Sequence, residues 1–279
     1  MGGAPRIGYH VSIAGTYDLA LDRAKEIGCT CMQIFPSNPR GWAVKELSEK
    51  EMYNFRAKAK AFDINPVFVH MPYLPNLASP KDDVYAKSKE AMIEALSRCN
   101  ALGARYLIVH LGSHLGLGAE AGRERVAAAV NEMERHAGNA TILLENEAGQ
   151  RNSVGSKLDE LVDIYNRVGH KQIGFCLDTC HVFAAGYDIS KREVAQEVTD
   201  TLGMERIHCL HLNDAKYPLG SGLDRHADIG FGRIGRSGFE NFFKVDGMKE
   251  KPMIMETPLV ETPRDAKGEL ALVKRILEP

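Results

Sequence analysis

The sequence predicts an α/β fold of the (β/α)8 TIM-barrel type, organised as a single domain over residues 1–279. Eight short apolar stretches of strand character alternate with eight amphipathic stretches of helix character, and about 250 residues is typical of this barrel. We find no linker or low-complexity segment that would divide the chain. An open, doubly wound sheet is the alternative, but no glycine-rich phosphate-binding turn follows the first predicted strand.

Each predicted element is supported by its own boundary signals. The strands cover residues 6–12, 31–37, 65–72, 104–112, 140–147, 173–180, 206–213 and 251–257. The first helix is expected to follow Thr16 as N-cap and to end at Gly28. Ser79 and Pro80 are expected to open a long third helix that ends at Gly103. The other helices are expected near residues 48–62, 126–137, 158–168, 190–202, 238–243 and 265–277.

Composition is that of a soluble globular protein, with 44% hydrophobic and 26% charged residues. No apolar run of about 18 residues is present, and the N-terminus lacks the apolar core of a secretion signal. The six cysteines contain no CxxC pair, so we expect reduced, buried thiols in a cytoplasmic protein, associated with the nucleoid in a prokaryote. The formal charge of −2 disfavours a nucleic-acid binder held by bulk charge, unless bound metal supplies positive charge.

Six of the predicted strands end in a histidine or an acidic residue. These are His70, His110, Glu145, Asp178, His211 and Glu256. Because the carboxyl ends of all strands meet at one face of a (β/α)8 barrel, where its active sites lie, these residues are expected to converge. His181 follows the sixth strand, and the glycine-rich loop after the seventh carries Asp224 and His226.

These nine side chains are candidate metal ligands. A mixture of imidazoles and carboxylates favours zinc or manganese over magnesium or a thiolate-bound metal, and nine ligands suit more than one ion. A metal-free network of hydrogen bonds is the alternative, although four carboxylates so close would repel one another without cations. Several neighbouring ions suit phosphodiester hydrolysis, because they can hold a hydroxide, clamp a phosphate and stabilise the departing oxygen.

The remaining polar residues near the strand ends are expected to play other roles. Strand alternation places His208 on the face opposite His211, between the sheet and the helices. His10 is expected to contact the ligands without binding metal. His114 is expected to lie near the site or on the surface, and Cys180 is expected to pack.

Three groups of segments carry a family resemblance. They are residues 70–77 (HMPYLPNL), residues 174–181 (GFCLDTCH), and residues 213–216 (NDAK) followed by 220–221 (GS), 224–226 (DRH) and 229–232 (IGFG). Together they resemble the signatures of endonuclease IV, the second family of apurinic/apyrimidinic (AP) endonucleases. The resemblance covers nearly the whole chain, with Pro75 and Phe231 as departures from the usual pattern.

The resemblance implies three zinc ions per chain, with manganese as a substitute. His70 and His110 would hold the first, and Glu145, the residue central to catalysis, would bridge it to the second. Asp178, His211 and Glu256 would complete the second site, and His181, Asp224 and His226 would form the third. A monomer would act on double-stranded DNA containing abasic sites in base excision repair. It would cleave 5′ to the lesion to leave a 3′-hydroxyl and would remove blocking groups from 3′ ends.

The same resemblance implies that Arg40, Tyr73 and Leu74 contact DNA by entering the base stack, which is weakest at an abasic site. Loop packing is the alternative role for Tyr73 and Leu74. Two other functions remain open for the whole chain. A sugar isomerase or epimerase on the same barrel would hold one or two metals, and a metal-dependent DNA-binding or structural protein would lack cleavage.

Overall fold

The computed structural model describes residues 4–39, 41–42, 46–169, 172–261 and 263–278. Its main sheet is built from eight strands. They are β1 (Ile7–Tyr9), β2 (Met32–Ile34), β3 (Val67–His70), β4 (Tyr106–Val109), β5 (Thr141–Glu145), β6 (Ile173–Asp178), β7 (Ile207–His211) and β10 (Met253–Met255). Their order, β1-β10-β7-β6-β5-β4-β3-β2, runs through parallel neighbours throughout. The predicted (β/α)8 barrel is confirmed.

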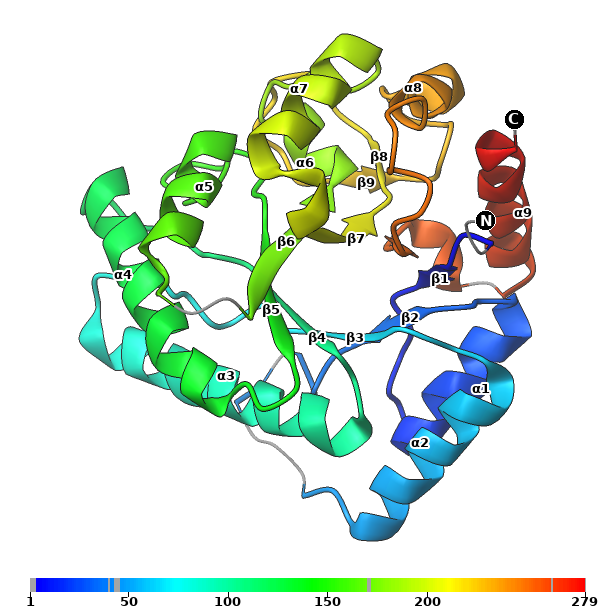
Figure 1. The fold of residues 1–279 in the computed structure, drawn as a ribbon, viewed down its shortest axis with the longest axis horizontal. Helices are drawn as coiled ribbons and strands as arrows, with labels where there is room; N and C mark the ends of the chain where they lie inside the picture. The colour runs from blue at the N-terminus through cyan, green and yellow to red at the C-terminus, as the bar shows by residue number, and fades with distance from the viewer. Residues whose placement is uncertain (1–3, 40, 43–45, 170–171, 262, 279) are drawn as a thin grey trace.

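Helices surround these strands (Figure 1). They are α1 (Tyr17–Ile27), α2 (Glu49–Phe62), α3 (Asp82–Leu102), α4 (Ala119–Met133), α5 (Leu158–Arg167), α6 (Thr179–Ala184), α7 (Arg192–Leu202), α8 (Gly235–Phe242) and α9 (Pro263–Leu277). Short 3-10 turns occupy Glu134–His136, Met204–Arg206 and Pro258–Glu261. Gly28 and Gly103 end α1 and α3 in the left-handed conformation, as predicted.

The predicted strands are longer than the observed ones, and α4 starts at Ala119 rather than near residue 126. Two further boundaries differ because of local hydrogen bonds. Ser79 and Pro80 do not open α3, because the Ser79 hydroxyl accepts the N–H of Lys81 at 3.1 Å and forms a turn before the helix starts at Asp82. The sixth strand ends at Asp178, whose carboxylate accepts the N–H of His181 at 2.7 Å. This N-cap begins α6 at Thr179, so the strand ends two residues before its predicted end at residue 180.

The barrel closes where β1 meets β2. A parallel bridge joins His10 to Gln33, and the N–H of Val11 donates to the carbonyl of Gln33 at 2.9 Å. The backbones approach so closely that a Cβ atom on Gly8 would lie 1.8 Å from the carbonyl oxygen of Cys31. Glycine is therefore required at this position, and the closure places Gln33 beside His10.

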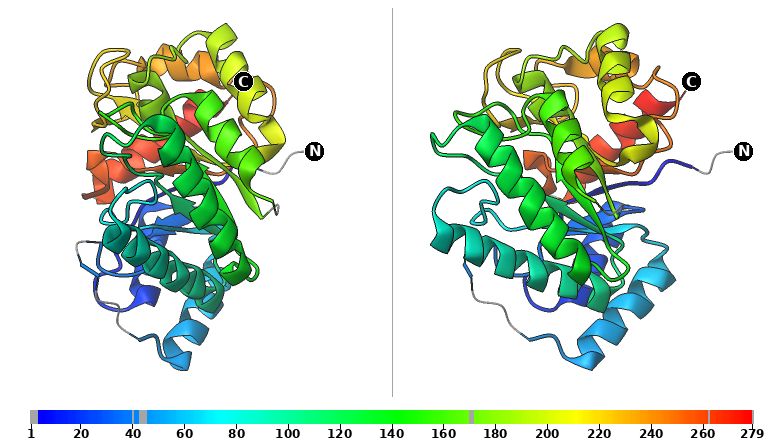
Figure 2. Two further views of the ribbon diagram at one scale, coloured as in Figure 1. Left: turned by 90° about the vertical axis from the view of Figure 1, so that its left-hand side faces the viewer. Right: turned by 60° about the vertical axis from the view of Figure 1, so that its left-hand side comes forward.

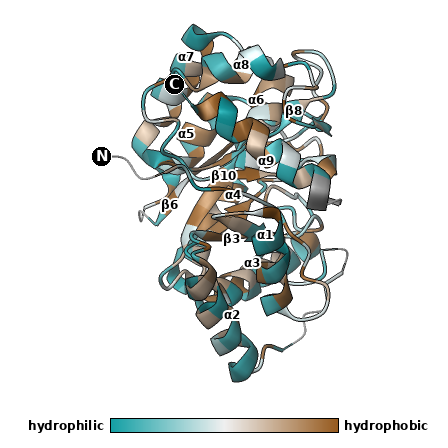
Figure 3. Ribbon diagram, turned by 90° about the vertical axis from the view of Figure 1, so that its right-hand side faces the viewer, coloured by the Kyte–Doolittle hydropathy of each residue, from teal (hydrophilic) through white to brown (hydrophobic). Residues whose placement is uncertain are grey.

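Two apolar layers pack against the strands, one inside the barrel and one outside it. The barrel interior is filled by Cys31, Phe68, Ile108, Leu143, Cys176, Cys209 and Ile254. The larger layer lies between the strands and the helices that pack around them (Figure 2). The outer faces of these helices are more hydrophilic (Figure 3). All six cysteines are buried and free, as expected from their apolar surroundings. Among the described residues, none of the helices is long and apolar enough to span a bilayer.

The segment after β7 is not a simple loop. β8 (Asp214–Ala215) pairs antiparallel with β9 (His226–Ala227), so that Ala215 lies opposite His226. This hairpin was not predicted, because two-residue strands are too short to show a periodic pattern. Its base is tied to the next turn by Asp214, whose buried carboxylate accepts backbone N–H groups from Gly230, Gly232, Ile234 and Gly235.

Candidate metal centre

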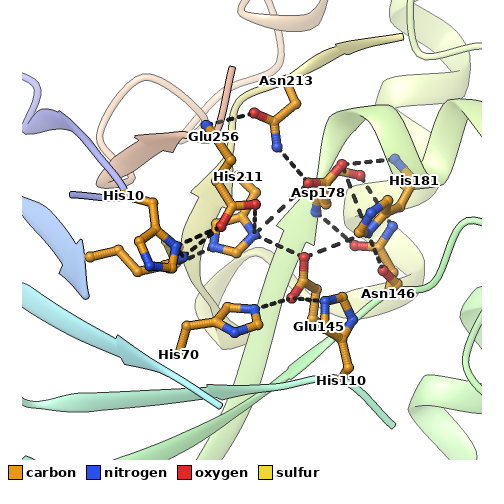
Figure 4. A network of polar contacts seen from close by, with 12 residues as sticks. His10, His70, His110, Glu145, Asn146, Asp178, His181, His211, Asn213 and Glu256 are labelled. Carbon is orange, nitrogen blue, oxygen red and sulfur yellow. Dashed lines mark hydrogen bonds and ion pairs between the residues drawn. The ribbon is translucent and has the colours of Figure 1, made fainter. Parts of the chain in front are cut away.

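The nine candidate ligands lie together at one mouth of the barrel. Figure 4 labels all of them except Asp224 and His226. Glu145, Asp178 and His211 are the last residues of β5, β6 and β7, and all three are fully buried. Other members line an open cavity of about 530 Å³. They are His70, His110, His181, Asp224, His226 and Glu256. The fold therefore brings every predicted ligand to the carboxyl ends of the strands.

Glu145 occupies the centre of the cluster. Its Oε2 atom lies 3.0 Å from Nε2 of His70 and 3.5 Å from Nε2 of His110. Its Oε1 atom lies 2.8 Å from Nδ1 of His211 and 3.5 Å from Nδ1 of His181. The two oxygens thus face different groups of histidines, which is the arrangement that a bridging carboxylate needs.

His211 faces carboxylates from two further strands. Its Nδ1 atom lies 3.8 Å from Oδ2 of Asp178 and 3.5 Å from Oε2 of Glu256. Together with Glu145 these residues surround a small volume at the carboxyl ends of β5, β6, β7 and β10. Imidazole nitrogen and carboxylate oxygen at this spacing could share one cation.

Asp224, between β8 and β9, contacts His181 on α6 and His226 on β9. Its Oδ1 atom lies 3.2 Å from Nε2 of His181 and 3.2 Å from Nε2 of His226. Both nitrogen atoms are buried, and neither forms a hydrogen bond of acceptable geometry with any described residue. Buried polar atoms without partners are rare, and two of them converging on a carboxylate oxygen are suited to a cation.

In four of the histidines, Nδ1 lies within hydrogen-bond distance of an oxygen acceptor. The pairs are His70 Nδ1 with Met71 O at 2.7 Å, His110 Nδ1 with Glu147 Oε1 at 3.1 Å, His181 Nδ1 with Asn146 O at 2.9 Å, and His226 Nδ1 with Glu256 O at 3.2 Å. A proton on each of these atoms leaves a lone pair on Nε2, directed at the carboxylates. Metal-binding histidines are held in this way.

The electrostatics of the cluster also favour bound cations. Burial alone would lower the pKa of His110, but the carboxylates of Glu145 and Glu147 raise it to about 10. Burial alone would raise the pKa of Glu145, but His110 and His211 hold it well below its usual range. The carboxylates therefore require positive charge beside them. Divalent cations bound among these side chains would provide it.

The donor set fits zinc or manganese, since it combines five imidazoles with four carboxylates. Cys180 lies near Asp178 and His226, but burial raises the pKa of its thiol, whose sulfur contacts the carbonyl of Arg225 at 3.6 Å. This favours packing over metal binding, in agreement with the expectation from sequence.

Several polar residues of the site were assigned no role from the sequence. Asn213 donates to Oδ2 of Asp178 at 2.7 Å and accepts the N–H of Glu256 at 2.8 Å. Asn146 donates to the carbonyl of Asp178 at 3.1 Å and accepts its N–H at 2.7 Å. Gln33 contacts His10, His211 and Glu256. Polar residues next to predicted ligands at strand ends are the one pattern that could have identified Asn146 and Asn213.

Three further histidines in the described part of the chain lie outside the cluster or at its edge. Nδ1 of His10 lies 3.1 Å from Oε1 of Glu256, so His10 contacts one of the candidate ligands. His208 stacks on Tyr106 with ring centroids 5.6 Å apart, and burial lowers its pKa. Tyr106 packs against the interior cluster, so His208 lies on the interior side of the strands and not between the sheet and the helices as expected. A register shift between β6 and β7 beside it breaks the strict alternation on which that expectation rested. His114 accepts the N–H groups of Gly116 and Gly118 and so shapes a turn.

Tyr73, one of the residues expected to contact DNA, lies at the same mouth, and Leu74 follows it in the chain. Tyr73 is 69% exposed and Leu74 is 42% exposed, and the ring centroid of Tyr73 lies 5.3 Å from that of Phe35. Tyr73 lines the cavity that holds the ligands. Arg40 lies outside the described residues. The two departures from the family pattern are Pro75, beside Leu74, and Phe231, which is 81% exposed.

Named relatives are similar to this chain over nearly its whole length. A probable endonuclease 4 from Methanoculleus marisnigri is 47% identical over 277 residues, which cover 97% of this chain and 98% of that protein. A second protein of that name, from Cenarchaeum symbiosum, is 45% identical over 278 residues, which cover 97% of this chain and 99% of its own. These identities extend over almost the full length of both relatives.

Solved structures and a family model also match nearly the whole chain. Endonuclease IV from Thermus thermophilus is similar with a TM-score of 0.88 at 34% identity, covering 98% of this chain and 99% of that chain. D-psicose 3-epimerase from Clostridium cellulolyticum has a TM-score of 0.73 at 17% identity, covering 98% of this chain and 100% of that chain. At this low identity the similarity shows only that the two proteins have the same fold. The family described as xylose isomerase-like TIM barrel matches residues 21–276. The chain therefore belongs to the endonuclease IV family of xylose isomerase-like TIM barrels.

Proposed function

We propose that the protein is a zinc-dependent AP endonuclease of base excision repair. It hydrolyses the phosphodiester 5′ to an abasic site in duplex DNA, leaves a 3′-hydroxyl and removes blocking groups from 3′ ends. The observation that carries this proposal is the convergence of three imidazole–carboxylate groups on one barrel mouth, joined by Glu145. Its relatives, named endonuclease 4, support the reaction class.

Three zinc ions would be distributed over the three groups, with manganese as a substitute. The first group is His70, His110 and Glu145, the second is Glu145, Asp178, His211 and Glu256, and the third is His181, Asp224 and His226. Bound zinc would supply Lewis acidity, which activates water and neutralises charge that develops on the phosphate and the leaving oxygen.

The protein supports this chemistry by fixing the ligands before substrate arrives. Asn213 holds Asp178 and the backbone of Glu256, so the ends of β6 and β10 keep one relative position. Glu147 accepts from His110, which leaves Nε2 of that ring directed at Glu145. Glu145, Asp178 and His211 are inaccessible to solvent, and attraction between charges is stronger where water is excluded.

DNA binding would use the rim of the same mouth. The formal charge of the chain is −2, and three divalent cations would add six positive charges at the face that meets the phosphates. Tyr73 and Leu74 present apolar groups next to the cavity, where they could enter the gap left by a missing base. Arg40 would accompany them in this role.

Incision of a duplex that carries one abasic analogue tests the proposal. The zinc-loaded protein should cut once, 5′ to the analogue, and the product should be extended by a DNA polymerase. Chelator treatment should stop the reaction, and added zinc should restore it. Absence of incision with zinc fully loaded would refute the nuclease. Epimerisation of a ketose by protein holding fewer than two metals would favour the sugar-converting alternative.

A further inference from the structure

Gln33 is a buried amide in the mouth of the barrel. It lies in the middle of β2, none of its surface is exposed, and its parallel bridge with His10 closes the barrel. Cys31, two residues earlier, belongs to the barrel interior, so strand alternation directs the side chain of Gln33 inward as well. The interior around Cys31 is otherwise apolar, which makes a buried amide there costly unless it is hydrogen-bonded.

The two ends of the amide contact two different candidate ligands. Its Oε1 atom lies 2.8 Å from Nε2 of His211, and its Nε2 atom lies 2.7 Å from Oε1 of Glu256. The carboxylate fixes the orientation of the amide. Were the amide reversed, its oxygen would lie beside the oxygen of Glu256 with no hydrogen between them.

This orientation determines the protonation of His211. An amide oxygen only accepts hydrogen bonds, so Nε2 of His211 carries a hydrogen and donates it to Gln33. The lone pair of the neutral ring then lies on Nδ1, which faces Glu145 Oε1 at 2.8 Å. The other four histidines of the cluster direct Nε2 at the carboxylates, and each has a backbone carbonyl or Glu147 as its acceptor. His211 alone among them depends on an amide side chain.

The same amide also orients Glu256. Oε1 of this residue accepts one hydrogen of the Gln33 amide at 2.7 Å, and the other amide hydrogen is directed at Nδ1 of His10 at 2.9 Å. With Oε1 held by Gln33, Oε2 is left facing Nδ1 of His211 at 3.5 Å. One side chain therefore presents both a lone pair of His211 and a free oxygen of Glu256 to the same small volume.

We propose that Gln33 is a positioning residue for the central metal group, where it selects the Nδ1 lone pair of His211 and orients Glu256. This inference rests on the proposed metal-dependent function. Loss of the amide would leave Nε2 of His211 without its acceptor and would free Glu256 to turn toward His10. The ion shared by Glu145, Asp178, His211 and Glu256 should then bind more weakly than the other two.

Zinc binding by Gln33→Leu tests this proposal, with Ile34→Ala as the matched control. Ile34 is the next residue of β2, is fully buried and packs in the outer apolar layer, so its truncation weakens the fold without touching the ligands. After equilibration with a competing chelator, Gln33→Leu should lose about one zinc per chain, with that zinc bound about 10- to 100-fold more weakly. Ile34→Ala should keep the wild-type zinc content.

A spectroscopic readout separates positioning from general stability. In the zinc-loaded wild-type protein, the ¹⁵N NMR signals of His211 should show that Nε2 carries the hydrogen. When cobalt replaces zinc, the visible absorption spectrum should contain one component from the central metal group, and Gln33→Leu should change that component. Gln33→Met, closer in length to glutamine, should behave like Gln33→Leu and serves if that variant fails to fold.

Three results would overturn the inference. Wild-type zinc affinity in a folded Gln33 variant would show that the amide does not position the ligands. Equal zinc loss in Ile34→Ala would attribute the effect to the fold. A wild-type chain that binds no zinc would instead refute the proposed function itself, and the role of Gln33 would fall with it.

Discussion

The backbone N–H of Gly232 donates to Oδ2 of Asp214 at 2.9 Å, and a Cβ atom at Gly232 would lie 2.4 Å from Oδ1 of that carboxylate. It would also lie 2.6 Å from the backbone oxygen of Ala215, which cannot rotate away. The turn after β9 can therefore close on Asp214 only if residue 232 lacks a side chain. This contact supports the hairpin that carries His226.

Gly232→Ala should lower the free energy of unfolding by about 1–3 kcal/mol, because the turn must move away from Asp214. Displacement of the hairpin should also weaken zinc binding at the group that contains His226. Gly268→Ala is the control, because its added Cβ would meet no atom within 4 Å and alanine favours a helix. Urea unfolding of the metal-free variants measures the difference, and equal stability of the two would contradict the role of Asp214.

Tyr73→Ala should reduce the preference for abasic over intact duplex by about tenfold, because an aromatic group that stacks in a base gap contributes on the order of 1–3 kcal/mol. Zinc content should not change. Tyr53→Ala is a matched control, since Tyr53 on α2 is 67% exposed and Tyr73 is 69% exposed. Competition binding with both duplexes gives the ratio. A similar loss in both variants would remove Tyr73 from lesion recognition.

Stability at alkaline pH should depend on Tyr9. Its hydroxyl donates to Glu269 at 2.6 Å, and burial together with the charge of Glu269 raises its pKa far above the ordinary 10.0. The folded state thus keeps a proton that the unfolded state loses, so the contribution of Tyr9 is fully present below pH 10 and falls as pH rises further.

Tyr9→Phe should therefore cost about 1–2 kcal/mol at neutral pH and should flatten the loss of stability above about pH 10. Tyr53→Phe, on the surface, should leave the alkaline profile of the wild type unchanged. Denaturant unfolding between about pH 8 and pH 11 measures both. An alkaline profile of Tyr9→Phe as steep as that of the wild type would show that Tyr9 does not control it.

Glu145→Ala should abolish incision and release zinc from the first two groups, because both depend on this carboxylate. Secondary structure should persist, since the barrel core is independent of the cluster. Glu205→Ala, which removes an exposed carboxylate near Arg206, is the control and should keep full activity. An active Glu145→Ala enzyme would show that the bridging role is wrong.

Much of the fold and of the metal centre could be predicted because a (β/α)8 barrel brings the ends of all its strands to one face, however far apart they lie in the sequence. Once eight strands were recognised, the polar residues at their ends had to share one mouth, and His70, Glu145, Asp178 and His211 are indeed terminal residues of their strands. Family resemblance then assigned these residues to metal groups. Apolar runs and glycine caps placed most helix boundaries.

The remaining features depend on register and on local hydrogen bonds. Gln33 looks like a polar residue in an ordinary strand, and its contacts follow from the bridge to His10 and from the position of β7 across the barrel. The β8–β9 hairpin depends on the carboxylate of Asp214, which gathers N–H groups from residues 230–235. Neither relationship produces a periodic pattern in the sequence.

The most direct test of the account is a zinc titration of the metal-free protein in which bound zinc and incision of an abasic duplex are measured together. The three-group centre predicts saturation at about three zinc ions per chain, with incision appearing only as the last sites fill. Saturation at a single zinc, or full loading without incision, would contradict it.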